Sequence, residues 1–150
     1  MVKIKLHDTT AILSVLDKLA TKRFNIKKVI TLAKVKKEVS ELRGTLITQE
    51  TAIFEKYMKK KEDGNFLVEN NNLVLKDTSP KSIQAFNKEM NDLHGSMVEL
   101  ESIHSPIVFD ESDVEVLSDI TSNDILALEG IIEINVDDQT SEEKEDTQSA

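Results

Sequence analysis

The sequence contains no cysteine and no tryptophan, and it has only one tyrosine, two prolines and four glycines. The absence of cysteine excludes disulfide scaffolds, thiolate metal sites and cysteine nucleophiles. The glycines are scattered singly along the chain, so a glycine-rich phosphate-binding loop is also excluded. No apolar run approaches the ~18 residues that span a bilayer, and the first residues lack an apolar stretch of signal-peptide length. We therefore expect a soluble, intracellular protein that makes no membrane contact.

Apolar residues are frequent enough to form a core, because Leu, Ile, Val and Phe make up 46 of the 150 residues. Charge is divided unevenly along the chain. Residues 1–61 carry 15 Lys/Arg against 6 Asp/Glu, whereas residues 62–150 carry 4 against 22, so the formal net charge of −9 combines +9 with −18. Residues 137–150 are acidic and contain no large apolar side chain. We expect one domain over residues 1–136 and a disordered acidic tail over 137–150.

The first 21 residues predict a strand followed by a helix. Residues 2–6 alternate apolar and basic side chains, which is typical of a strand with one buried face. Asp8, Thr9 or Thr10 is placed to cap a helix that ends near Thr21. The apolar residues of that helix fall on one face, chiefly at Ile12, Leu16 and Leu19.

A long helix is predicted over residues 25–61. One face has the three-and-four spacing of a coiled-coil seam, at Leu32, Val35, Val39, Leu42, Leu46 and Ile53. A second stripe lies about 150° around the helix. It consists of Ile26, Ile30, Ala33, Ser40, Gly44, Ile47, Phe54 and Met58. Either the preceding helix covers part of this stripe, or the stripe is a contact between copies of the chain in a homo-oligomer.

Residues 65–76 predict a β-hairpin. Asn70 and Asn71 tolerate the left-handed backbone of a type I′ turn, and apolar residues flank them on both sides. In that register Phe66 lies opposite Leu75, and Val68 lies opposite Leu73. A two-stranded hairpin cannot bury such a face alone, so these four residues must dock on helices, on other strands or on a partner.

Ser79-Pro80 is typical of a helix start, and the spacing of Ile83, Phe86, Met90, Leu93, Met97 and Leu100 predicts a helix that continues to Leu100. The chain beyond predicts short extended segments at 106–109 and 114–117. A short helix from Ser122 through Leu128 follows, and a final strand over 131–136 pairs with residues 2–6. The expected fold is of the α+β class: a long antiparallel helical hairpin with a β-hairpin at its tip, plus a small sheet from the N- and C-terminal strands.

Residues with catalytic or metal-binding chemistry form no recognisable pattern. His7, His94 and His104 belong to three different predicted elements, and no Ser/His/Asp arrangement has supporting context. We therefore expect no enzyme activity, no metal site and no cofactor. The acidic residues Asp110, Glu111, Asp113 and Glu115 resemble part of a calcium loop but lack its central glycine and terminal glutamate. They predict a solvated acidic edge.

The basic half of the chain allows two interpretations. Its lysines and arginines are dense enough to hold phosphates, yet aromatic residues that would stack on bases are few. Alternatively, the acidic half of the chain neutralises them internally.

Several short motifs of the middle and end of the chain occur together: Phe54-Glu55-Lys56-Tyr57, Asp63-Gly64-Asn65, Ala85-Phe86-Asn87-Lys88-Glu89-Met90, Val98-Glu99-Leu100, Asp124-Ile125-Leu126-Ala127-Leu128-Glu129 and Ile131-Ile132-Glu133. With these motifs, residues 1–135 resemble a family of small uncharacterised proteins of tailed phages and prophages of Gram-positive bacteria. The resemblance implies a phage accessory or structural protein in the host cytoplasm or the virion. It implies no active site.

These observations favour a non-enzymatic phage protein that acts in virion (tail or capsid) assembly or structure through protein–protein contacts, with itself or with a phage structural protein. One alternative is an inhibitor whose acidic surface contacts a host protein, namely a host defence enzyme. A second alternative is nucleic-acid binding by the basic helical half. The predicted partner-binding residues are Phe66, Val68, Leu73 and Leu75 for assembly, and Asp110, Glu111, Asp113 and Glu115 for inhibition.

Overall fold

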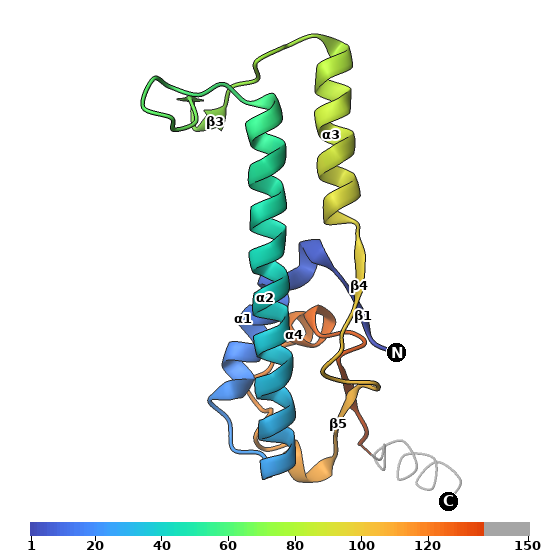
Figure 1. Cartoon of the computed structure of the whole chain (residues 1–150). Coiled ribbons are helices and arrows are strands. Elements are labelled where there is room, and N and C mark those ends of the chain that lie inside the picture. The colour runs from blue at the N-terminus through green and yellow to red at the C-terminus, as the bar shows by residue number, and fades with distance from the viewer. Residues whose placement is uncertain (137–150) are drawn as a thin grey trace, which may run out of the picture.

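The structure combines helices, one of them long, with small two-stranded sheets, so the mixed helix-and-strand content predicted from the sequence is confirmed (Figure 1). The computed structural model describes residues 1–136, and the predicted disordered tail at 137–150 lies outside the described residues. The helices are α1 (Thr9–Ala20), α2 (Ile26–Tyr57), α3 (Pro80–His94) and α4 (Ser122–Ala127), with 3-10 turns η1 (Leu6–Asp8) and η2 (Glu111–Asp113). The strands are β1 (Lys3–Lys5), β2 (Val68–Glu69), β3 (Asn72–Leu73), β4 (Met97–Glu99), β5 (Ile107–Phe109) and β6 (Ile132–Ile134).

Helix α2 runs the length of the molecule, and its predicted seam is buried. Leu32, Val35, Val39 and Leu46 are all buried, which confirms that this face of the helix points into the protein. The lower part of the seam packs on α1 and on the C-terminal elements, where Phe109, Leu128 and Ile131 complete the main core. The upper part of α2 lies beside α3, which runs in the opposite direction (Figure 1).

The second apolar stripe of α2 is not covered by α1. Helix α1 packs its Ile12, Leu16 and Leu19 into the seam cluster and reaches only the edge of the stripe. Ile26 is 70% exposed, and Ile30 and Ile47 are also exposed. The interpretation that α1 covers part of this stripe is therefore wrong for its isoleucines. Near the C-terminal end of α2 the stripe is covered, because Met58 is buried.

Helix α2 ends at Tyr57, four residues before the predicted end. The oxygen of the Asn25 side chain caps its first turn by accepting a hydrogen bond from the Lys28 amide at 3.0 Å. At the other end, residues 58–61 leave the helix and pair as extended chain. Met58 bridges to Leu75, and Lys60 bridges to Phe66. These strand-like bonds take the place of the last predicted helical turn.

Helix α3 begins as predicted and ends early. The Ser79 hydroxyl accepts a hydrogen bond from the Ser82 amide, and Pro80 occupies the first helical position. The prediction that the helix continues through Met97 to Leu100 is wrong, because residues 97–99 form β4. Leu100 is instead buried in the main core, and its amide donates to the Val2 carbonyl at 2.8 Å.

The terminal strands pair differently from the prediction. Strand β1 is antiparallel to β4, with Ile4 opposite Val98, whereas β6 is parallel to β5, with Ile107 opposite Ile132. The predicted pairing of β1 with the final strand is therefore wrong. Strand β4 supplies the opposite charge that the prediction sought from the final strand, since Lys3 lies opposite Glu99.

The acidic segment after β5 is not the extended chain that was predicted at 114–117. It forms η2 and a series of turns, stabilised by a capping box. The Asp110 carboxylate accepts a hydrogen bond from the Ser112 amide, and the Asp113 carboxylate accepts one from the Asp110 amide. The cap of α4 is Thr121 rather than Ser122. Gly130 follows that helix with a φ of +83°, a conformation that glycine adopts readily.

Candidate functional site

The β-hairpin lies at the far end of α2 from the main core (Figure 1). Val68 is opposite Leu73, as the sequence predicts, and the turn residues Asn70 and Asn71 have φ values of 51° and 64°. The predicted opposition of Phe66 and Leu75 is wrong, because each of them bridges to residues 58–61 instead. Among the four predicted partner-binding residues of the hairpin, Val68 is the most open, with 52% of its surface exposed.

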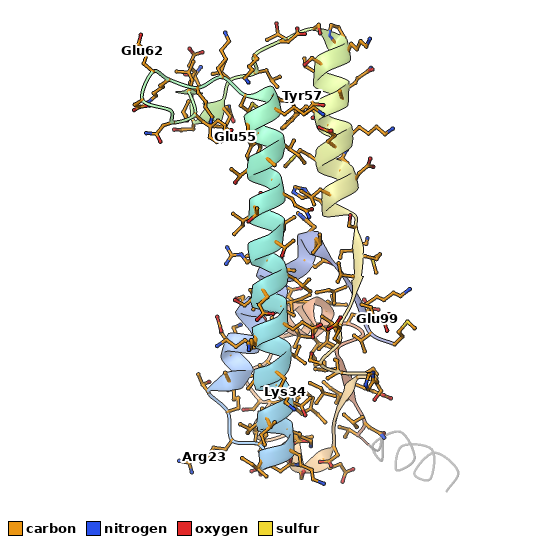
Figure 2. All side chains as sticks on the ribbon, in the orientation of Figure 1. Arg23, Lys34, Glu55, Tyr57, Glu62 and Glu99 are labelled. Atoms are coloured by element: carbon orange, nitrogen blue, oxygen red, sulfur yellow. The ribbon has the colours of Figure 1, made fainter. Side chains whose placement is uncertain are left out.

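Aromatic packing fixes the hairpin on the helices. The ring of Phe66 meets Phe54 edge-on with 6.2 Å between centroids, and Phe86 of α3 lies 6.2 Å from Phe54 and 5.6 Å from Tyr57. Figure 2 shows Tyr57 directed toward α3. The Lys60 ammonium lies 5.5 Å from the centroid of the Phe66 ring. Phe66 is therefore partly buried against Phe54 of α2 and Lys60, whereas Val68 is left for other contacts.

The acidic segment lies near the opposite end of α2, and its four predicted residues have different environments. Asp113 is buried and forms an ion pair with Lys28, so it contributes to the fold. Asp110 is exposed, and hydrogen bonds from the Ser112 hydroxyl lead the interactions that lower its pKa. Glu111 and Glu115 are exposed. The predicted solvated edge therefore includes Asp110, Glu111 and Glu115 and excludes Asp113.

Ion pairs link the basic and acidic halves of the chain. Lys18 lies 3.0 Å from the Asp124 carboxylate, Lys22 pairs with Asp119, and Lys28 pairs with Asp113. The hydrogen bonds from the Thr121 amide and the Lys18 ammonium lower the pKa of Asp124. The interpretation that the acidic half neutralises basic residues internally holds for these three lysines and for Lys56, which pairs with Glu89 at 2.8 Å.

Two of the three histidines lie together, although the sequence places them in separate elements. The rings of His7 and His94 are 5.2 Å apart between centroids, and His94 Nε2 lies 3.1 Å from Glu50 Oε1. Three elements, η1, α2 and α3, meet here. Within residues 1–136, no group of three or more His, Cys, Asp or Glu side chains is arranged to hold a metal ion.

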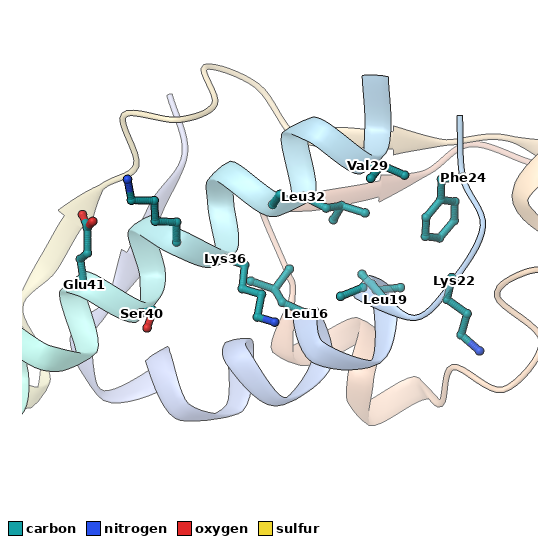
Figure 3. Close-up of a pocket in the computed structure, with 12 residues that line it drawn as sticks. Leu16, Leu19, Lys22, Phe24, Val29, Leu32, Lys36, Ser40 and Glu41 are labelled. Atoms are coloured by element: carbon teal, nitrogen blue, oxygen red, sulfur yellow. The ribbon is translucent and has the colours of Figure 1, made fainter. Parts of the chain in front are cut away.

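A groove of about 500 Å³ lies between α1 and α2, and sequence reasoning did not identify it (Figure 3). Apolar side chains from both helices and the intervening loop form its floor: Leu16, Leu19, Ala20, Phe24, Val29, Leu32 and Ala33. Three lysines, Lys22, Lys36 and Lys37, lie at its rim with Ser40 and Glu41. The signal that points to it is the stretch of residues 18–37, which contains eight Lys/Arg and no Asp/Glu between two amphipathic helices.

The loop before α2 holds one end of the groove in place. The Thr21 hydroxyl donates to the Lys18 carbonyl at 2.7 Å, and Phe24 packs on the buried Phe109 with 5.1 Å between ring centroids. Lys36 is paired with Asp17 of α1 at 2.8 Å, which ties the two walls together. The groove is thus built by packed elements rather than by a loose loop.

Comparison with family models, curated proteins and solved structures found no match in any of the three. Among residues 1–136, no helix combines the length and apolar character needed to cross a membrane. The function of this chain is therefore inferred from its own surfaces.

Proposed function

We propose that this chain is a non-enzymatic phage accessory protein that acts in virion (tail or capsid) assembly or structure through protein–protein contacts. The supporting observation is the exposure of large apolar side chains at the tip and along one side of α2. Val68 and Ile83 are exposed at the tip, and Ile26, Ile30 and Ile47 are exposed along the helix. Apolar surface of this kind is typical of sites that bind other proteins.

The shape of the molecule suits an assembly contact. Helix α2 has 32 residues, and at 1.5 Å per residue it is about 48 Å long. The main core packs near its N-terminal end, and the β-hairpin lies at its C-terminal end (Figure 1). We infer that α2 and α3 act as an antiparallel helical hairpin, which holds the β-hairpin away from the core and presents it to a neighbouring subunit.

The test compares two matched substitutions in a phage that encodes this protein. Val68→Asp places a charge on the exposed hairpin, whereas Val108→Asp makes the same change on β5, where Val108 is 44% exposed. We expect Val68→Asp to reduce the number of complete particles at least about tenfold, because a desolvated charge weakens an apolar contact. We expect Val108→Asp to leave the particle number unchanged.

Particles are counted by electron microscopy, and circular dichroism of both purified variants verifies that they fold. Wild-type particle numbers from folded Val68→Asp protein would contradict the proposed use of the hairpin. Wild-type numbers after deletion of the whole gene would contradict the assembly role itself.

The two alternative functions, inhibition of a host enzyme and nucleic-acid binding, stay predictions. Asp113, one of the four acidic residues assigned to inhibition, forms a buried ion pair with Lys28. Six lysines of the basic half are likewise paired with acidic residues of the same chain: Lys18, Lys22, Lys28, Lys36, Lys56 and Lys60. Both pairings reduce the charged surface that these alternatives require.

A further inference from the structure

We propose that the groove between α1 and α2 binds an acidic amphipathic helix of a partner protein. This inference rests on the proposed assembly role and deepens it, since it names the chemistry of one partner. The groove and the β-hairpin lie in different parts of the molecule, so the two contacts can be tested separately (Figures 1 and 3).

The floor of the groove has the size and character that a helix requires. The whole groove follows α2 from Val29 to Glu41, which is about 18 Å at 1.5 Å per residue and matches roughly three turns of a bound helix, and the apolar floor occupies its end from Val29 to Ala33. Leu16 and Leu19 of α1 face Leu32 at its buried base (Figure 3), and Val29 and Ala33 expose apolar surface above them. A helix in such a groove places apolar side chains at positions i, i+3, i+4 and i+7 on the floor.

Apolar surface continues from the groove onto the exposed side of α2. Val29 lines the groove and is exposed, and Ile26 and Ile30 flank it on the same helix. A bound helix would remove this apolar surface from water, which favours binding.

The charges around the groove select an acidic partner. Of the eight basic residues in 18–37, four pair with carboxylates of the chain itself. Within residues 1–136 the other four, Arg23, Lys27, Lys34 and Lys37, form no ion pair, and Lys37 is the one of these four that lines the groove. Glu41, at one end, is the single acidic residue that lines the groove in the described part of the chain. Complementary charge speeds encounter and suppresses binding of basic partners.

Other occupants fit less well. A nucleic acid would contact the basic side chains but would leave the exposed apolar residues Val29, Ile26 and Ile30 without apolar contacts. Residues 137–150 of this chain are acidic but have no large apolar side chain for that floor. Within residues 1–136, a second copy offers no free acidic helix of suitable length, because α3 uses its apolar face against α2.

The test uses two designed peptides of roughly 14 residues with leucines at i, i+3, i+4 and i+7. One has glutamates on its other face, and the second has lysines there. Fluorescence anisotropy measures their binding to the full chain. We expect the glutamate peptide to bind at least about tenfold more tightly than the lysine peptide.

Three variants locate the binding site. Ala33→Trp fills the groove from an exposed position, and Lys37→Glu reverses a charge at the rim. Lys34→Glu makes the same reversal on the same helix but at a residue that does not line the groove. We expect the first two variants to weaken binding of the glutamate peptide at least about tenfold, and Lys34→Glu to change it by less than about threefold.

Equal binding of the two peptides, or full binding by Ala33→Trp, would overturn the inference. Decanoate that binds wild type but not Ala33→Trp, with no peptide binding, would assign the groove to a fatty acyl chain and would also overturn it. If the peptide fails to bind while Val68→Asp still reduces particle number, the groove inference fails alone. If the peptide binds as expected while deletion of the gene leaves particle number unchanged, the assembly role fails and the groove remains a binding site.

Discussion

Lys28 and Asp113 form the most deeply buried ion pair within residues 1–136, with 14% and 7% of their side chains exposed. The carboxylate of Asp113 also accepts a hydrogen bond from the Asp110 amide at 3.0 Å, which closes the capping box of η2. Lys28 lies 5.6 Å from the centroid of the Phe109 ring, at the edge of the main core. This one side chain therefore connects the start of α2 to the acidic segment.

We predict that Lys28→Met reduces the free energy of unfolding by about 3 kcal/mol, because it leaves the buried Asp113 carboxylate without its cation. Lys27→Met is the matched control, since the neighbouring Lys27 is exposed, and we expect a change of about 0.5 kcal/mol or less. Urea unfolding followed by circular dichroism measures both values. An equal, small effect of the two substitutions would show that Asp113 is satisfied without Lys28.

Asn70 and Asn71 decide the stability of the hairpin at the level of a structural element. Both residues have positive φ, which asparagine tolerates and β-branched residues strongly disfavour. The turn sets the register that places Val68 opposite Leu73. Close beside it, the Leu67 amide donates to the Lys59 carbonyl at 2.9 Å and thereby ties the hairpin to the end of α2.

We predict that Asn71→Val loosens the hairpin and leaves the main core intact. Amide hydrogen exchange measures this directly: the Leu67 and Val74 amides, which are bonded within the tip, exchange at least about tenfold faster, whereas amides of α1 exchange as in wild type. Asn71→Gly serves as the control, because glycine adopts positive φ freely and keeps the turn. Slower exchange in Asn71→Val than in Asn71→Gly would contradict the role assigned to this turn.

Local signals in the sequence predicted the starts of elements well. Asn25, Ser79-Pro80 and Asn70-Asn71 act through their own backbone and nearest neighbours, so the sequence alone specifies what they do. Pairing between distant segments has no such signal. Met97 and Leu100 continue the spacing of α3, yet β4 forms because β1, more than ninety residues earlier, offers a strand partner.

In the candidate sites, too, local features were predictable from the sequence and contacts between distant segments were not. The opposition of Val68 and Leu73 follows from a two-residue turn, and it was predictable. Phe66 and Leu75 do not lie opposite each other, because residues 58–61 pair with both arms of the hairpin. The sequence of residues 58–61 continues the helical pattern of α2, so it does not predict this pairing. The groove depends on the gap between two helices whose apolar faces are each visible in the sequence. Their relative placement is set by loop and core contacts, such as that between Phe24 and Phe109.

At the scale of the whole molecule, two effects of charge oppose each other. The net charge of −9 favours unfolding through self-repulsion, and acid reduces that repulsion by protonating carboxylates. The folded protein, however, holds several carboxylates in their charged form. Lys22 leads the interactions that lower the pKa of Asp119, the Thr121 amide and Lys18 lower that of Asp124, and Lys56 lowers that of Glu89.

We predict that the second effect dominates and that acid destabilises the protein. A carboxyl group whose pKa is lower in the folded state adds stability above its unfolded pKa, about 3.9 for Asp and 4.3 for Glu, and loses that contribution as pH falls through the folded pKa. Urea unfolding at a series of pH values should therefore give a free energy that is level near pH 7 and falls below about pH 5. Asp119→Asn removes one of these groups, and its free energy should decline less steeply over the same range. A free energy that rises on acidification would instead show that relief of the net negative charge outweighs the ion pairs between the two halves of the chain.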